Sequence, residues 1–276
     1  ASYSKMKGAA IGVCEIVQNI SAYTLFSGSS GNSCYVSCKG ESILIDAGVS
    51  CMRLSAALAS LGADIKSIKA IFITHEHTDH VKGLDMISKK YRIPIFCTKY
   101  VALAIAAQST YSRDMIHIIE PDDTVYLENM TVSASKVPHD SADNVCYRIT
   151  MDGAELGYAT DIGRLTKRVA ETLCGCRYVV VESNHDIAML NNGPYPQYLK
   201  QRILSDGGHL SNDDCARLVP YLVSHGCRYV VLAHLSGENN TPELAVACCK
   251  AALEENEMAG EATVAVALPD RPVKII

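Results

Sequence analysis

Short apolar runs alternate with helical patterns along most of this chain, and the alternation limits the fold more than any other feature. Several apolar runs are continuous, which is typical of strands that are covered on both faces. Helical segments between such strands predict an α/β protein with helices layered on a sheet. We predict strands at residues 22–26, 42–46, 70–74, 93–97, 130–137, 145–151, 155–160, 178–181, 229–233 and 262–267.

Helices are predicted between these strands from the 3.6-residue spacing of apolar side chains. They are expected at residues 52–61, 81–91, 100–108, 164–173, 197–205, 212–224 and 242–257. Pro220 lies inside one of them, where a missing N–H group predicts a kink or an early end. The absence of linker-like sequence predicts one domain at residues 21–276, and residues 1–20 are interpreted as a leader or extension.

The composition disfavours several classes of protein. No run approaches the ~20 consecutive apolar residues of a membrane span, and the N-terminus lacks the sections of a secretory signal. Twelve cysteines include no CxxC pair and often lie in apolar runs, which predicts buried thiols in a reducing cytoplasm. The net charge of −5 gives no general attraction to nucleic acid, so such binding would need a local basic patch.

A polar cluster follows the predicted strand at 70–74, and it reads His75-Glu76-His77-Thr78-Asp79-His80. A strand that turns into a helix is where α/β proteins place ligand-binding side chains. Imidazoles and a carboxylate supply the donors that first-row metals take. His75 and His77 can project to the same side of an extended segment, and Asp79 and His80 would then face a second ion. A polar surface loop is the alternative, but partly buried imidazoles without partners are costly.

Three later residues could complete the coordination that this cluster leaves unfinished. His139 follows the predicted strand at 130–137, Asp161 follows the one at 155–160, and His234 follows the one at 229–233. Strand ends of this kind converge at one rim of a sheet. Each residue alone would more often be structural, but their shared placement favours a metal site.

The pattern His75-x-His77-x-Asp79-His80, followed by His139, Asp161 and His234, resembles the metallo-β-lactamase superfamily with its binuclear site. The match covers nearly the whole chain in the same order. The resemblance implies a four-layer αββα sandwich with two divalent metal ions, zinc or manganese or else iron, at one edge of its two sheets.

The same resemblance implies how the ligands are shared between the ions. It assigns one ion to His75, His77 and His139, and the other to Asp79, His80 and His234. Asp161 is implied as the bridging carboxylate, at the position where lactam-hydrolysing members have a cysteine. This difference points to phosphodiester or thioester hydrolysis.

Further motifs are similar to those of the WalJ/YycJ (VicX) group. They read FSGSSGNS at 26–33, LIDAG at 44–48, ESNHD at 182–186, GHLSN at 208–212 and LAHLS at 232–236, with NGPYP at 192–196 and ENNTPE at 238–243. That group is cytoplasmic and bacterial, is encoded beside a cell-wall two-component system, and has been described as having nuclease activity, including DNA exonuclease action. The resemblance implies a nucleic acid, DNA or RNA, as substrate and a link to that signalling system, and it leaves the oligomeric state open.

Two residues are predicted to take part in catalysis. A pair of cations can make hydroxide available near neutral pH, and Asp79 is the best candidate to accept the proton of the water. His209 precedes Ser211, which is a plausible N-cap of the helix at 212–224. At a helix N-terminus His209 could bind phosphate or donate a proton to the leaving oxygen. The alternative is a structural histidine in a capping loop.

Other candidate contacts lie in the motifs around these residues. Ser30 and Asn32 belong to a Ser/Gly loop that could hold a phosphate or could simply connect two strands. Ser211 and Asn212 are candidate substrate contacts beside His209. Glu182, Asn184 and His185 follow a buried strand and are interpreted as groups that support the ligands from behind, with His185 acting through Glu182 or Asn184. The alternative for His185 is an extra metal or substrate contact.

The sequence leaves three classes of function open. We predict a metal-dependent phosphodiester hydrolase, most simply a nuclease that resembles DNA exonucleases. A small-molecule hydrolase, such as a thioesterase similar to glyoxalase II or a cyclic phosphodiesterase, is the second. A regulatory protein of cell-wall signalling is the third, and the intact set of ligands weighs against it.

Overall fold

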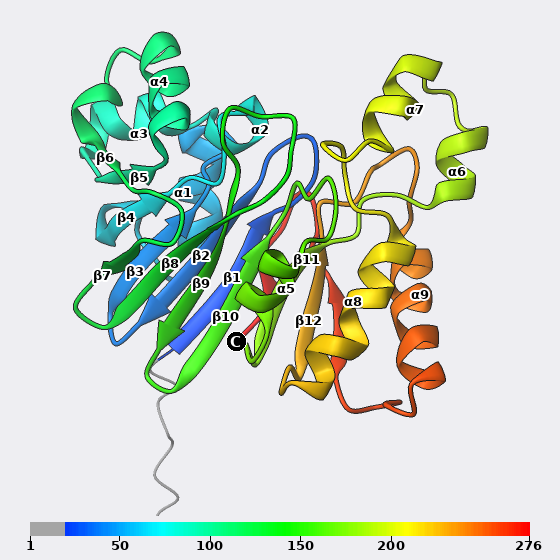
Figure 1. The fold of residues 1–276 in the computed structure, drawn as a ribbon. Coiled ribbons are helices and arrows are strands. Elements are labelled where there is room, and N and C mark those ends of the chain that lie inside the picture. The colour runs from blue at the N-terminus through cyan, green and yellow to red at the C-terminus, as the bar shows by residue number, and fades with distance from the viewer. Residues whose placement is uncertain (1–19) are drawn as a thin grey trace, which may run out of the picture.

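The computed structural model describes residues 20–276, and its two sheets lie face to face between outer helices (Figure 1). The first sheet contains, in spatial order, β14 (Val273–Lys274), β1 (Ile20–Phe26), β2 (Ser33–Cys38), β3 (Glu41–Ile45), β4 (Ile68–Phe72), β5 (Ile95–Cys97) and β6 (Ile116–Ile118). Strands β1 to β3 pair antiparallel, and β3 to β6 pair parallel. The predicted leader at residues 1–20 lies outside the described residues, apart from Ile20.

The second sheet repeats this mixture of antiparallel and parallel pairing. Its order is β13 (Thr263–Val266), β12 (Tyr229–Ala233), β11 (Tyr178–Glu182), β10 (Ala154–Ala159), β9 (Val145–Met151), β8 (Met130–Lys136) and β7 (Thr124–Tyr126). Strands β10 to β13 pair parallel, so the ends of β10, β11 and β12 point to the same edge. The turn between β9 and β10 places Asp152 and Gly153 at positive φ, as the Asp-Gly signal predicts.

Helices cover the outer face of each sheet. The first sheet is covered by α1 (Cys51–Ser60), α3 (Leu84–Tyr91) and α4 (Lys99–Gln108), with the short α2 (Thr78–Val81) at its upper edge (Figure 1). The second is covered by α5 (Lys167–Leu173), α8 (Asn212–Ser224) and α9 (Pro242–Glu255). Two more helices, α6 (Ile187–Asn192) and α7 (Gln197–Ile203), project beyond the sheets between β11 and α8.

Three apolar clusters separate the four layers. The middle cluster joins side chains of both sheets, such as Val36 and Phe72 of the first and Tyr147 and Val231 of the second. The outer clusters lie between each sheet and its helices. The buried inner faces explain why several strands read as continuous apolar runs. The predicted four-layer αββα sandwich is confirmed.

The helix predicted at 81–91 differs from the structure in an informative way. The helical segment starts at Thr78 and breaks at Lys82–Gly83 before α3 begins. Gly83 must pass close to a neighbouring loop, because a Cβ there would lie 2.4 Å from the backbone oxygen of Val49. Helix α8 runs through Pro220 without ending early. Within residues 20–276, no helix has the length and apolar character needed to cross a membrane.

Candidate metal centre

The predicted donors converge at one edge of the two sheets. His75 and His77 follow β4, Asp79 and His80 lie in α2, His139 follows β8, Asp161 follows β10 and His234 follows β12. Asp161 and His234 have positive φ values of 57° and 56°. Such backbone is costly for residues other than glycine, and it is often found at functional sites.

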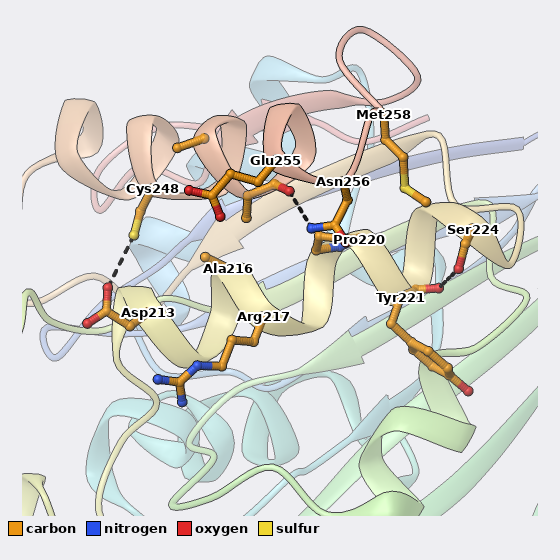
Figure 2. A pocket seen from close by; sticks show the side chains of 12 residues that line it. Asp213, Ala216, Arg217, Pro220, Tyr221, Ser224, Cys248, Glu255, Asn256 and Met258 are labelled. Atoms are coloured by element: carbon orange, nitrogen blue, oxygen red, sulfur yellow. Dashed lines mark hydrogen bonds between the residues drawn. The ribbon is translucent and has the colours of Figure 1, made fainter.

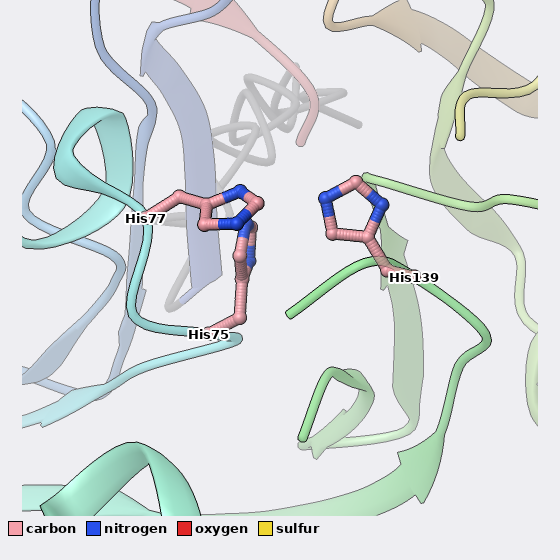
Figure 3. A group of neighbouring side chains, drawn as sticks. All are labelled: His75, His77 and His139. Atoms are coloured by element: carbon pink, nitrogen blue, oxygen red, sulfur yellow. The ribbon is translucent and has the colours of Figure 1, made fainter. Parts of the chain in front are cut away.

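One group of donors consists of His75, His77 and His139, and Figure 3 shows their rings pointing toward a common centre. One ring nitrogen of each lies within 4.8 Å of the others. The first two come from the loop after β4, whereas His139 comes from the second sheet. Three imidazoles at this spacing form a typical partial coordination shell for a first-row metal.

A second group consists of Asp79, His80 and His234. The Oδ2 atom of Asp79 lies 3.5 Å from Nε2 of His80 and 3.5 Å from Nε2 of His234. Asp161 lies between the groups and is 1% exposed. Its Oδ2 is 3.2 Å from Nε2 of His80, and its Oδ1 is 3.8 Å from Nε2 of His139. Asp161 therefore contacts members of both groups, which is the geometry needed in a bridging carboxylate.

Most of the imidazoles are held in place through Nδ1. This atom lies 3.0 Å from Thr74 Oγ1 in His75, 2.8 Å from Asp46 Oδ2 in His80, 2.9 Å from the Gly208 oxygen in His139, and 2.9 Å from Glu182 Oε1 in His234. Partners of this kind fix the ring orientation and the tautomer of metal-binding histidines. In His75, His139 and His234 the Nε2 atom has no hydrogen-bond partner among the described residues and remains for a ligand, whereas Nε2 of His80 lies 3.0 Å from the amide nitrogen of Asn32.

Several of the atoms at the centre are buried without a hydrogen-bond partner among the described residues. They are Nε2 of His75, His139 and His234, and Oδ2 of Asp161. A buried polar atom without a partner costs free energy, and several such atoms facing one another are rare in a folded protein. A pair of divalent metal ions would satisfy all of them, so the residues present fit a metal centre.

The electrostatics of the cluster also favour a cation. Burial and the charge of His80 lower the pKa of His75 well below its ordinary value, which keeps it in the neutral form that binds metal. Burial alone would lower the pKa of His234, but Asp161, Asp79 and Glu182 raise it to about 10. A proton on His234 thus compensates carboxylate charge, and a metal ion can replace that proton.

Glu182 connects His234 to the predicted catalytic residue His209. Its Oε1 lies 2.9 Å from Nδ1 of both histidines, and its Oε2 accepts hydrogen bonds from the backbone N–H groups of Ile162 and Leu210. Burial would raise the pKa of Glu182, but the charge of His209 and the hydrogen bonds with His209 and His234 lower it to about 2. Burial would lower the pKa of His209, yet Glu182 raises it overall. The structure therefore holds a carboxylate–imidazole pair beside the donors.

The other residues predicted to contact the substrate differ in their exposure and in their hydrogen-bond partners. Ser30 is exposed at a loop tip, whereas Asn32 is 1% exposed and donates to Asp79 Oδ2 at 3.2 Å. Ser211 caps α8, and Asn212 is buried in a network with Ser183 and Asn240. Neither Ser211 nor Asn212 lines the cavity over the donors.

Two of the three residues interpreted as supports lie close to the ligands. Glu182 holds His234 as described, and the Asn184 amide donates to the His234 backbone oxygen at 2.7 Å. His185 is 1% exposed, and neither of its ring nitrogens has a hydrogen-bond partner among residues 20–276. The structure therefore does not connect His185 to Glu182 or Asn184 by a hydrogen bond.

A cavity of ≈ 220 Å³ opens over the donors and includes residues that sequence reasoning missed. Tyr195, Leu199 and Arg202, which belong to the segment carrying α6 and α7, form one wall. Arg202 pairs with Asp140, with 3.1 Å between Nη2 and Oδ1, so the projecting segment is tied to the loop that carries His139. The NGPYP motif contains Tyr195 and was a signal for it, and the basic pair Lys200 and Arg202 was a signal for Arg202, although such a pair is also typical of a solvated helix face.

A larger groove of ≈ 670 Å³ lies between α8 and α9, away from the donors (Figure 2). Its lining includes Asp213, Arg217, Tyr221, Cys248 and Glu255. None of the predicted ligands lines it. Volume alone therefore does not identify the reactive site in this molecule, whereas the buried donors do.

Comparison with known proteins agrees with this geometry. The family model described as beta-lactamase superfamily domain matches residues 41–235, a stretch that contains all the donors named above. The chain is 34% identical over 232 residues to exodeoxyribonuclease YycJ of Bacillus anthracis, covering 84% of this chain and 88% of that protein.

One more curated protein and one solved structure are similar to this chain over most of its length. Identity is also 34% over 224 residues to exodeoxyribonuclease WalJ of Streptococcus pneumoniae serotype 2, covering 80% of this chain and 83% of that protein. Among solved structures, the metallo-beta-lactamase fold protein YhfI from Bacillus subtilis superposes with a TM-score of 0.68 at 14% identity. That match covers 93% of this chain and 100% of YhfI, and it shows similarity of fold.

Proposed function

The chain belongs to the metallo-β-lactamase superfamily and, within it, to the family of YycJ and WalJ, and on this basis we propose that it is a metal-dependent exodeoxyribonuclease. The observation that carries the proposal is the pair of donor groups that share Asp161 on the floor of a cavity. Relatives named exodeoxyribonucleases align over most of the chain, which supports DNA as the proposed substrate class.

The proposed cofactor is a pair of divalent ions, zinc or manganese. His75, His77 and His139 would hold one ion, Asp79, His80 and His234 the other, and Asp161 would contact both. Ions held there would lower the pKa of a water molecule and offset the charge of a phosphodiester. Imidazole and carboxylate donors accept several first-row metals, so availability in the cell selects among them.

The chain's own residues supply the proton transfers. Burial would raise the pKa of Asp79, but the imidazoles of His234 and His80, whose Nε2 atoms lie 3.5 Å from its Oδ2, hold it below its ordinary value, so the carboxylate is ionised. Asp79 also lines the cavity, where it can accept the proton of the attacking water. His209 is held by Glu182 through Nδ1, which leaves Nε2 to donate a proton to the leaving oxygen. Arg202 lies in the wall of the same cavity and can contact a phosphate.

The proposed location is the cytoplasm. Cysteines in the described part of the chain are free thiols, and most of them are buried. Burial raises the pKa of several, for example Cys146 to about 12, which keeps them protonated and unreactive. Such a distribution suits a reducing compartment.

The metal proposal predicts a measurable stoichiometry. The protein is first freed of metal with a chelator and then reloaded with metal. It should retain about two ions per chain, as measured by elemental mass spectrometry. At a free concentration of 100 times the dissociation constant, each ion should stabilise the fold by about 2.7 kcal/mol and raise the Tm by several degrees. His139→Ala should lose metal, whereas the matched change His117→Ala, at an exposed position on β6, should not. Equal metal content in the two variants would contradict the assignment.

The activity itself can be tested with end-labelled DNA and added Mn²⁺ or Zn²⁺. We expect stepwise release of the labelled end without internal cuts, and no release in excess chelator. Labels at the 5′ end and at the 3′ end in separate reactions establish the polarity. Turnover of a thioester in the absence of any DNA cleavage would refute the proposal and favour a small-molecule hydrolase.

A further inference from the structure

A second cavity adjoins the one over the donors. It measures ≈ 410 Å³ and is formed by the loop after β1, the segment after β12 and the segment after β13. Ser29 and Ser236 line both cavities, so the two spaces meet at these residues. A group bound at the donors could therefore extend directly into the second cavity.

The chemistry of the second cavity differs from that of the first. Its walls include Leu235, Val266, Leu268 and Pro269 together with serine, glycine and asparagine residues, and no charged side chain of residues 20–276 lines it. A phosphate would find no cation there, whereas an uncharged and partly apolar group would bury its surface favourably. The volume lies within the range of small-molecule sites.

The walls are held rigidly by contacts with the donor residues. Ser27 Oγ accepts a hydrogen bond from the His234 backbone N–H at 2.8 Å. Asn32 fixes the loop after β1, because its Oδ1 accepts from Gly28 N at 2.9 Å while its Nδ2 donates to Asp79 Oδ2 at 3.2 Å. Residues that hold the metal ligands thus also shape the cavity, so its position relative to the donors is preformed.

We propose that this second cavity binds the nucleoside that is bonded to the phosphate held at the donors. The inference rests on the proposed nuclease function, because a phosphodiester at the donors carries a nucleoside on each side. Ser29 and Ser30 are exposed at the loop tip and line the cavity, so their hydroxyl groups can contact the sugar or the edge of the base. No aromatic ring in the described part of the chain lines the cavity. Binding of the base therefore relies on burial of its surface and not on stacking against an aromatic side chain.

The test uses two substrates with the same scissile bond. Methyl p-nitrophenyl phosphate and thymidine 5′-(p-nitrophenyl phosphate) both release nitrophenol, and only the second carries a nucleoside. The 3′ ester of thymidine covers the opposite orientation. Leu268→Trp fills the cavity from a half-buried position, and Pro269→Trp fills it from an exposed one. Leu103→Trp, on the exposed face of α4, is the matched control.

We expect the metal-loaded wild-type protein to prefer a thymidine ester over the methyl ester in kcat/KM. Each cavity-filling variant should reduce this preference about tenfold while leaving turnover of the methyl ester unchanged, and Leu103→Trp should leave both unchanged. An unchanged preference in both cavity variants, for both thymidine esters, would overturn the inference but not the nuclease proposal. A wild-type protein that hydrolyses no phosphodiester with added metal would overturn the nuclease proposal and the inference with it.

Discussion

Asp79→Asn should reduce the kcat for DNA hydrolysis by about 10²- to 10⁴-fold, the range expected when a positioned proton acceptor is lost. The change keeps the shape of the side chain and an oxygen near His80 and His234, but it removes the charge that accepts the proton. KM should change less than kcat, because the amide still fits the cavity. Steady-state kinetics with the metal-loaded variant give both constants.

The metal content of Asp79→Asn separates two reasons for lost activity. If the asparagine variant retains both ions yet is inactive, the carboxylate acts in catalysis as well as in binding. Loss of metal would instead assign the defect to coordination. Asp206→Asn is the control, because Asp206 is an exposed carboxylate outside the cavity lining. Full kcat in a metal-loaded Asp79→Asn protein would refute its role as proton acceptor.

The fold could be largely predicted because the strands are buried on both faces. The strands predicted at 145–151 and 229–233 coincide with β9 and β12, and the other predicted strands differ from the structure by one or two residues at an end. Strands β2, β6, β7 and β14 and helix α6 were missed. Strand β6 is short and lies at a sheet edge, so it has little apolar signal, whereas β2 mixes serine and cysteine with only two larger residues.

The position of the donors could be predicted because each follows a strand end or the turn after it. Their supports could be predicted only in part: Glu182 and Asn184 follow a strand end as the donors do, but contacts between distant segments decide which donor each support holds. Asp46 holds His80 across 34 positions of the chain, and Glu182 holds His209 and His234 together. Asn212 shows the opposite error: it lies beside a site residue in sequence, but the start of α8 turns its amide into the interior. Proximity in the sequence therefore indicates where a site lies, but it does not indicate which side chains face that site.

Gly48 is the residue through which packing most directly controls the donors. A Cβ at this position would lie 1.6 Å from the Asp79 backbone oxygen and 2.6 Å from the Asn32 backbone nitrogen. Those two atoms are themselves joined by a hydrogen bond of 2.7 Å, and Gly48 N donates to the Asn32 oxygen at 2.9 Å. The loop after β3, the loop after β1 and α2 are thus in backbone contact, with no space for a side chain.

Gly48→Ala should therefore displace α2 and the donors that it carries. We expect a loss of about 3 kcal/mol or more in the free energy of unfolding, the upper range for overpacking, and a fall in Tm of roughly 6–12 °C. Metal content should fall together with stability, although no ligand has been changed. Thermal unfolding of the metal-free protein measures the packing effect alone. Gly237→Ala is the stability control, because a Cβ there would meet no atom within 4 Å. If Gly48→Ala kept both its metal and its Tm, the close approach of α2 would not be needed to position Asp79 and His80.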